Sequence, residues 1–186
     1  MNETMKTILR RRAVRQFKKD QIKESDLKEI LNAAIHAPNA QNLQRWHFTV
    51  VQDKPMLDKM VEITKTNMRD SKIPFFQERI SAPDYNTYYH APTIILVSGD
   101  ANHKFIDLDC GLAAQNILLA AESLGISSII MTSSEFLFAS KNAAEIKKEL
   151  GVPEGYRHIC VIALGYREGA MPATPDRNKN VINYIK

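Results

Sequence analysis

The sequence is poor in glycine, and the few glycines exclude several kinds of site. Its 186 residues include 7 glycines, and no two of these form a Gly-X-Gly. A Rossmann dinucleotide loop and a Walker A loop both need closely spaced glycines, so we expect neither. The sequence also lacks a GxSxG elbow and an HExxH helix. It therefore offers neither the nucleophile of an α/β-hydrolase nor a zinc-hydrolase helix.

Cysteine is scarce too. The two cysteines, Cys110 and Cys160, lie in apolar segments, with no CxxC and no Cys/His cluster at zinc spacing. We therefore expect a reduced, cytoplasmic chain without a metal. The arrangement closest to a metal site is His103 with Asp107 at i, i+4, beside Asp109 and Cys110. Solvated residues at the start of a helix are the favoured interpretation of that group.

Charge and hydropathy set further limits. The 25 Lys and Arg against 21 Asp and Glu give a net charge of +4, which is too small to define a nucleic-acid binder. The N-terminus carries an early acid and the basic run 10–12 where a secretion signal would need an apolar core. The most apolar stretches, 111–124 and 159–164, are interrupted or too short for the ~20 residues of a membrane helix. We expect a single domain over 1–186 that neither spans nor binds a membrane.

Hydrophobic periodicity predicts helices that alternate with strands. In chain order the predicted elements are a helix at 24–37 with Ser25 as N-cap, a strand at 47–51, a helix through 57–64, a strand at 93–97, a helix at 107–124, a strand at 127–131, a helix at 139–150 and a strand at 158–164. This order favours one sheet flanked by helices, of the α+β or α/β class.

Three segments do not suit an isolated domain. Residues 65–91 show no pattern and contain Pro74 and Pro83, so we expect a long irregular excursion there. The 107–124 helix is apolar on nearly every side, which favours burial on several faces, a partner subunit included. The tail, 167–186, has no core of its own and must lie over the domain or reach another chain.

The densest charge feature is the segment from Arg10 to Arg15, with four arginines in six residues, followed by Phe17. Guanidinium groups pair with phosphate oxygens in a bidentate manner, so several of them on one short turn suit a phosphate monoester. A solvated basic helix end explains the same residues without a ligand. This segment alone leaves both interpretations open.

A second polar feature lies between the first predicted helix and strand. The loop 37–45 carries the side-chain amides Asn39, Gln41, Asn42 and Gln44, just before Trp46. Amides supply donors and acceptors together, which suits a flat heterocycle with alternating carbonyls and ring nitrogens. The alternative is an ordinary polar loop. Together, the two segments are typical of a ligand with a phosphate at one end and a polar ring at the other.

Six segments follow one another along the sequence: Arg11-Arg-Ala-Val-Arg15-x-Phe17, Ala37-Pro-x-x-x-Asn42-x-Gln44-x-Trp46-x-Phe48, His90-Ala-Pro-Thr-Ile-Ile, the run from Asp109 to Gly125, Leu150-Gly-Val-Pro-Glu-Gly-Tyr156 and Ala163-Leu-Gly-Tyr166. In this order they resemble the FMN-dependent nitroreductase family, and the chain resembles a short member of it. The likeness runs from about Arg10 to Tyr184. Each segment alone is weak, but six in order are specific.

The resemblance implies an α+β fold with a nitroreductase-like central mixed sheet flanked by helices. It implies a homodimer in which the C-terminal strand is exchanged, so that the tail 167–186 crosses to the partner, and two FMN molecules bind at the interface. Such a dimer would also account for the apolar helix and the coreless tail.

The resemblance also carries the FMN contacts over to numbered positions. Arg11 and Arg12 match residues on the phosphate, Ala13 lies in the same segment, and Arg15 matches a position near the pyrimidine edge of the flavin ring. A second group matches the loop that meets the ring and ribityl chain, in part from the other subunit: Pro38, Asn39, Asn42 and Gln44. Arg177 matches a C-terminal phosphate arginine.

Several positions depart from the family pattern. Ala13 stands where a serine is usual, and Pro175 where a lysine is common near Arg177. Arg45 replaces the usual proline before Trp46. The customary glycine-containing turn after the 127–131 strand is replaced by residues 132–134, so the backbone N–H that meets flavin N5 stays unassigned.

The implied activity is a ping-pong transfer of hydride from NAD(P)H through FMN to an electron-poor acceptor such as a nitroaromatic or a quinone. The flavin would perform the chemistry, which agrees with the absence of a conspicuous acid–base pair or nucleophile, and Arg15 is the candidate that tunes the reduced flavin. Two alternatives stay open: a flavin store or sensor with little turnover, and a basic nucleic-acid module using residues 10–15, Arg177 and Lys179. Reductive dehalogenation or flavin fragmentation on the same scaffold would depend on residues 65–91.

Overall fold

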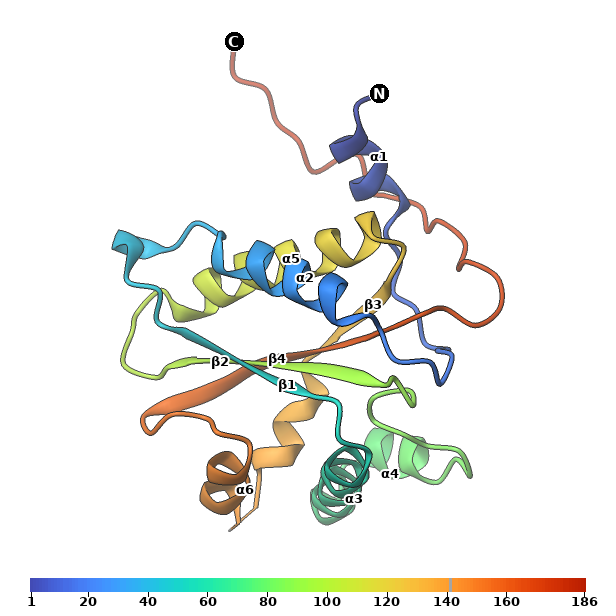
Figure 1. The fold of residues 1–186 in the computed structure, drawn as a ribbon, viewed down its shortest axis with the longest axis vertical. Helices are drawn as coiled ribbons and strands as arrows, with labels where there is room; N and C mark the ends of the chain where they lie inside the picture. Colours follow the sequence, from blue (N-terminus) through green and yellow to red (C-terminus); the bar gives the residue numbers. More distant parts are fainter. Residues whose placement is uncertain (141) are drawn as a thin grey trace.

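A four-stranded sheet forms the centre of the computed structural model, which describes residues 1–140 and 142–186 (Figure 1). The strands are β1 (Trp46–Val51), β2 (Thr93–Asp100), β3 (Ser127–Met131) and β4 (Tyr156–Gly165), in the order β1-β2-β4-β3. All four predicted strands are confirmed, with β2 and β4 longer than predicted. The α+β class is confirmed as well.

The predicted mixed character of the sheet is wrong for these strands. All three ladders are antiparallel, and parallel pairing in the described chain is limited to the bridge between Ala13 and Ser128. The ladder between β1 and β2 shows the reason, because Val51 at the end of β1 pairs with Ile94 at the start of β2. The connection between them returns the chain to the same end of the sheet, which hydrophobic periodicity does not encode.

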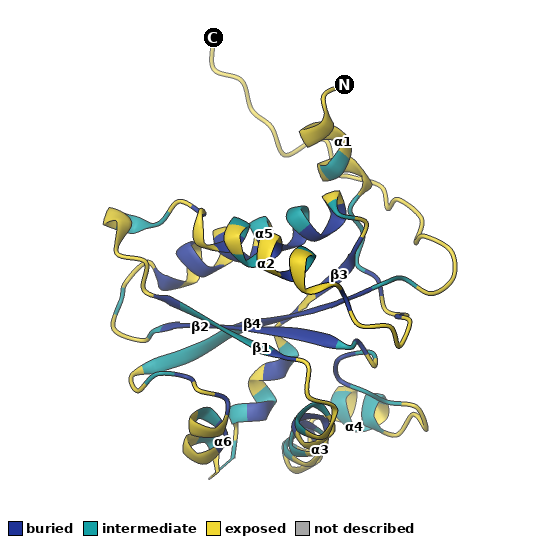
Figure 2. Ribbon diagram, in the orientation of Figure 1, coloured by how far each residue is buried: buried dark blue, intermediate teal, exposed yellow. Residues whose placement is uncertain are grey.

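Helices cover both faces of the sheet. The helical segments are α1 (Glu3–Arg10), α2 (Glu24–Ile35), the short 3-10 turn η1 (Ala40–Asn42), α3 (Lys54–Asp70), α4 (Pro74–Ile80), α5 (Ile106–Ser123), the 3-10 segment η2 (Ser133–Phe138) and α6 (Ala143–Glu149). One face packs on α2 and α5, and the other on α3, η2 and α6 (Figures 1 and 2). Because both faces are covered, seven of the eight residues of β2 are buried.

The helix predictions need several corrections. The predicted Ser25 cap is wrong, since Lys23 is the N-cap of α2 and makes no side-chain cap hydrogen bond. The helix predicted through 57–64 extends to Asp70, and α4 begins at Pro74 inside the predicted irregular excursion. The helix predicted at 139–150 is α6, preceded by η2. Helix α1 was not predicted, and none of its eight residues is buried in this single chain.

Of the two segments expected to meet another chain, the tail is exposed in this single chain, whereas α5 packs on the sheet and is exposed at a few apolar side chains. The tail from residue 168 onward is exposed and extends away from the sheet beside α1 (Figure 2). On α5, Leu108 and Leu112 are 62% and 37% exposed. Within the described residues, no helix has the length and apolar character needed to cross a membrane. Cys110 and Cys160 are free and buried, and the cytoplasmic location stays a prediction.

Candidate active site

The cationic segment, residues 10–17, lies along the edge of β3. The Val14 N–H donates to the Ser128 carbonyl at 3.1 Å, and Val14 and Phe17 are 2% and 6% exposed. Between these two buried residues, Arg15 and Gln16 are exposed. Neither Arg11 nor Arg15 has an acidic partner within 4.0 Å among the described residues. Their charges are therefore available to an anion.

The other two arginines of the segment are already engaged. Arg10 forms an ion pair of 2.7 Å with Glu122, whose side chain is 8% exposed. Arg12 donates to the carbonyls of Leu9 and Arg11 at 2.6 and 2.8 Å and to the Thr174 hydroxyl. The Nε of Arg12 is buried and has no hydrogen-bond partner in the described part of the chain. Arg12 thus joins the end of α1 to the tail, and its predicted phosphate contact stays a prediction.

The amide loop, residues 37–45, has a strained backbone that its own polar groups hold in place. Gln41, Asn42 and Gln44 have φ values of 56°, 52° and 52°, in the left-handed region that costs non-glycine residues about 1 kcal/mol or more. The Asn39 Oδ1 accepts the Gln44 N–H at 2.8 Å, and the Asn42 Oδ1 accepts from the Gln44 side chain at 3.3 Å. Asn39 therefore supports the loop that was predicted to bind the flavin.

Asp109 fastens this loop to α5. Its side chain accepts the Ala40 N–H at 3.0 Å and contacts His103 Nε2 at 3.1 Å, and the residue is only 2% exposed. The i, i+4 pair of His103 with Asp107 is not formed, because Asp107 pairs instead with Arg157 at 2.6 Å. Within the described residues, no three His, Cys, Asp or Glu side chains form a group suited to a metal ion.

An apolar hollow of about 250 Å³ borders the amide loop. Pro38, Asn39 and Ala40 line one side of it, and Phe105, Leu108 and Leu112 line the other. Exposed apolar side chains beside a polar loop are typical of a surface that another chain covers.

The cationic segment and the amide loop do not meet within one chain. In Figure 1 the amide loop lies at the far left of the helical layer, whereas residues 11–20 lie at its right end beside β3. The two predicted halves of the FMN site are therefore on separate surfaces. The predicted Arg177 lies in the exposed tail, and Ala13 pairs through its backbone with Ser128.

The turn after β3 is held by a buried serine and histidine. Ser134, 0% exposed, places its Oγ 2.8 Å from His158 Nε2, and the hydroxyl donates to the Met131 carbonyl at 3.3 Å. With the hydroxyl donating to Met131, His158 Nε2 is the donor to Ser134, and among the described residues the buried Nδ1 has no partner. Burial, together with the charge of Lys147, lowers the pKa of His158 to about 4. The neutral ring therefore fixes the turn at neutral pH.

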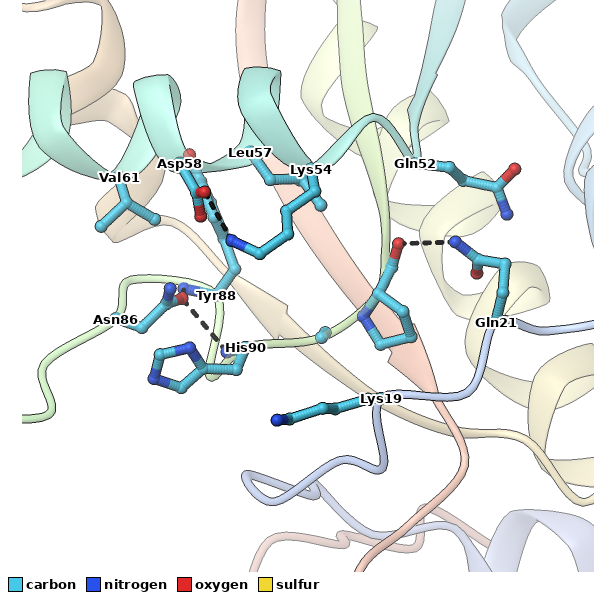
Figure 3. Close-up of a pocket in the computed structure, with 12 residues that line it drawn as sticks. Lys19, Gln21, Gln52, Lys54, Leu57, Asp58, Val61, Asn86, Tyr88 and His90 are labelled. Atoms are coloured by element: carbon cyan, nitrogen blue, oxygen red, sulfur yellow. Dashed lines mark hydrogen bonds and ion pairs between the residues drawn. The ribbon is translucent and has the colours of Figure 1, made fainter.

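A second hollow, of about 330 Å³, lies where α3 begins (Figure 3). Lys54 pairs there with Asp58 at 2.5 Å, and the Gln21 side chain donates to the Pro92 carbonyl at 2.9 Å. None of the predicted FMN residues lines it. We therefore assign it no part in cofactor binding.

Comparison with known proteins decides the family. The sequence profile described as "Nitroreductase family" matches residues 8–166. The chain belongs to this family. Its activity is accordingly of the NAD(P)H-flavin oxidoreductase class.

Individual members of the nitroreductase family agree over most of the chain. A protein of Archaeoglobus fulgidus named as an NADH dehydrogenase/NAD(P)H nitroreductase is 32% identical over 171 residues, which cover 89% of this chain and 86% of that protein. An FMN-bound nitroreductase of Bacteroides fragilis superposes with a TM-score of 0.94 at 33% identity, and one of Desulfitobacterium hafniense with 0.91 at 35%. Both superpositions cover 100% of each chain.

Sequence reasoning about this nitroreductase-family protein missed two residues that shape its site. Asp109 was interpreted, with its neighbours, as a solvated residue at the start of a helix, which is wrong because it is only 2% exposed. An acid in the first turn of a helix is a common partner for a nearby backbone N–H. Asn86 lay in the segment that showed no pattern, yet its Oδ1 accepts the N–H groups of Tyr88 and His90 at 2.8 and 3.1 Å. An Asn that binds the backbone two residues onward is a turn signal, and this one was available in the sequence.

Proposed function

We propose that this protein is an FMN-dependent NAD(P)H oxidoreductase that works as a homodimer in two half-reactions. Bound FMN would take a hydride from NAD(P)H and, after the nicotinamide leaves, pass it with a proton to an electron-poor acceptor such as a nitroaromatic or a quinone. Family membership supports the class of reaction, and the FMN-bound structures of similar proteins support the cofactor.

The residues present fit FMN at both of its ends. Arg11 has no acidic partner within 4.0 Å among the described residues, so its guanidinium donors are available to a phosphate of about −2 charge. The amides of the loop 37–45 are exposed and already held in one conformation, which suits the polar edge of the flavin ring. Arg177 would join the phosphate from the tail.

The main support for the dimer is that the cationic segment and the amide loop, which would bind the two ends of FMN, lie apart within one chain. A composite site, with the cationic segment of one protomer and the amide loop of its partner, would bring them together. The exposed Leu108 and Leu112 would then be covered, and the tail 167–186 would cross to the partner sheet as an exchanged strand. Such an interface is isologous and forms two equivalent sites.

Arg15 is the candidate that tunes the flavin. The resemblance supports a position at the pyrimidine edge, where a cation would stabilise the anionic reduced ring. Its guanidinium carbon lies 5.9 Å from the centroid of the Tyr89 ring, a cation–π arrangement that limits its movement. No other catalytic acid, base or nucleophile is part of this proposal.

The test uses the purified full chain. We expect a yellow dimer whose flavin, released by denaturation, chromatographs as FMN, bleaches with NADH or NADPH under anaerobic conditions and is reoxidised by a nitroaromatic or a quinone. Release of FAD would contradict the cofactor, and bleaching without reoxidation by any acceptor would favour a flavin store. A monomer that retains flavin at micromolar concentration in sedimentation would contradict the composite site.

A further inference from the structure

The hollow beside Arg15 contains two arginines without acidic partners. It measures about 420 Å³ and is lined by Arg15, by Arg79 of α4, and by Tyr85 and Tyr89 of the connection to β2. In the described part of the chain, no carboxylate lies within 4.0 Å of either guanidinium. Two uncompensated cations on one concave surface attract an anion.

Tyr89 holds both guanidiniums in place. Arg15 lies over its ring at 5.9 Å, and Arg79 Nη2 donates to its hydroxyl at 3.1 Å. Arg79 also lies 5.8 Å from the centroid of the Tyr85 ring. Only one donor of Arg79 has a hydrogen-bond partner among the described residues, so the remaining N–H groups can meet a carboxylate.

The loop that presents Tyr89 is strained and rigidly held. Tyr89 and His90 have φ values of 55° and 56°, in the left-handed region. Asn86 maintains this conformation by accepting the N–H groups of Tyr88 and His90, and Figure 3 shows its side chain turned back toward His90. Strained backbone held by such contacts occurs where a side chain must keep a defined position for a ligand.

The hollow also has an apolar side and one acid. Phe75, 64% exposed, lines it and offers a surface for an aromatic ring. Asp84 lines it as well and reduces its positive charge. If Arg15 is committed to the flavin, as proposed above, Arg79 is the cation left for a substrate.

We propose that this hollow selects a small aromatic electron acceptor that carries a carboxylate, with Arg79 as the specificity-determining residue and Tyr89 as its positioning residue. The inference rests on the proposed function, which puts the flavin ring beside Arg15. The carboxylate pairs with the free donors of Arg79, and the substrate ring lies against Phe75. Neutral acceptors lose this ion pair and are reduced less efficiently.

The test compares 4-nitrobenzoate with 4-nitrobenzamide, which differ in charge but little in shape. The readout is the ratio of kcat/KM for the benzoate to that for the benzamide, measured on the FMN-loaded dimer. Arg79→Gln should lower this ratio about tenfold, Arg79→Lys should restore part of it, and Asp84→Asn should raise it about two- to threefold. The control is Arg69→Gln, an exposed arginine of α3 outside the hollow, which should leave the ratio at its wild-type value.

Binding without turnover gives a second readout. In the absence of NAD(P)H the oxidised protein does not consume 4-nitrobenzoate, so calorimetric titration measures its dissociation constant alone. We expect this constant to rise about tenfold in Arg79→Gln and severalfold in Tyr89→Phe, which keeps the ring but loses the hydroxyl. An Arg79→Gln variant that folds and reduces both compounds with the wild-type ratio would overturn the inference.

Two further outcomes separate this inference from the proposed function. A wild-type protein that does not bind FMN, or that does not reduce 4-nitrobenzamide, would count against the proposed function itself. A change confined to the preference between NADH and NADPH in Arg79→Gln would assign the hollow to the nicotinamide donor and overturn the inference about the acceptor.

Discussion

The cationic segment and the amide loop are positioned by different means. The cationic segment is fixed through its backbone, two buried apolar side chains, and the contacts of Arg10 and Arg12, so the outward Arg11 and Arg15 contribute little to its shape. The amide loop instead has a strained backbone that is fixed by polar side chains, some of which were predicted to bind the ligand. Substitutions of outward side chains in the cationic segment should therefore change FMN binding with little effect on stability. Substitutions in the amide loop should change both.

The largest effect should come from the anchor of the amide loop. Asp109→Ala leaves the Ala40 N–H and His103 without their buried acceptor, so we expect the free energy of unfolding to fall by about 3 kcal/mol and FMN binding to weaken with it. Urea unfolding and flavin titration measure the two quantities. The matched control is Asp107→Ala, which removes an exposed pair with Arg157 and should cost no more than about 0.5 kcal/mol.

The turn after β3, which lies outside both regions, should respond to acid through His158. Its pKa is lowered to about 4 in the folded chain, so the unfolded chain binds a proton first as the pH falls. The stability linked to this ring is fully present above its unfolded pKa of about 6.5 and is lost between there and about pH 4, by roughly 2–3 kcal/mol. Urea unfolding at pH 7 and pH 4.5 measures the loss. His158→Gln should reduce that pH dependence, and an equal dependence in the variant would contradict the assignment.

Arginine substitutions should affect binding far more than folding. Arg11→Ala or Arg177→Ala removes a charge-assisted contact worth about 1.5–3 kcal/mol, which corresponds to a roughly ten- to hundredfold weaker FMN affinity. Stability of the flavin-free chain should stay within about 0.5 kcal/mol. Arg15→Ala should keep much of its FMN but lower the flavin potential in a redox titration. Wild-type FMN affinity in both of the first two variants would defeat the phosphate assignment.

The smallest expected effect is on stability, from glycine substitutions that change only the conformational freedom of the backbone. Gln41→Gly relieves a left-handed φ but adds freedom to the unfolded chain, and these effects of about 1 kcal/mol nearly cancel. Gln16→Gly in the cationic segment relieves no strain and should cost about 0.5–1 kcal/mol. Thermal unfolding of the two variants compares them directly. An equal loss in both would show that the amide loop is not strained.

The sequence allowed the strands to be predicted well, because β2 and β4 are apolar runs buried on both faces. The end of α3 could also have been predicted, since Met60, Thr64 and Met68 follow at four-residue spacing and all are buried. Pro74 was interpreted as a break, although proline is favoured in the first turn of a helix, where it begins α4. For all three elements the pattern was present in the sequence, and the prediction was right or wrong according to how that pattern was interpreted.

The site was less predictable because its contacts join distant positions. Nothing local shows that Asp109 accepts the Ala40 N–H, 69 residues away. The engagement of Arg12 with Thr174 likewise depends on where the tail lies, so four similar arginines could not be ranked from the sequence. Asn39 matched a flavin-binding position but also supports its own loop, and only the folded backbone reveals this second role.

The connection between α3 and β2 has a consequence for how new specificities can arise. Residues 71–92 carry Phe75, Arg79 and Tyr89, and the loop that presents Tyr89 is fixed mainly by Asn86 within the same stretch. The segments proposed to hold the flavin lie elsewhere in the chain. Mutations within residues 71–92 can therefore change which acceptor is preferred, while the segments proposed to hold the flavin keep their sequence. Descendants of one scaffold could in this way diverge in substrate without first losing the redox chemistry.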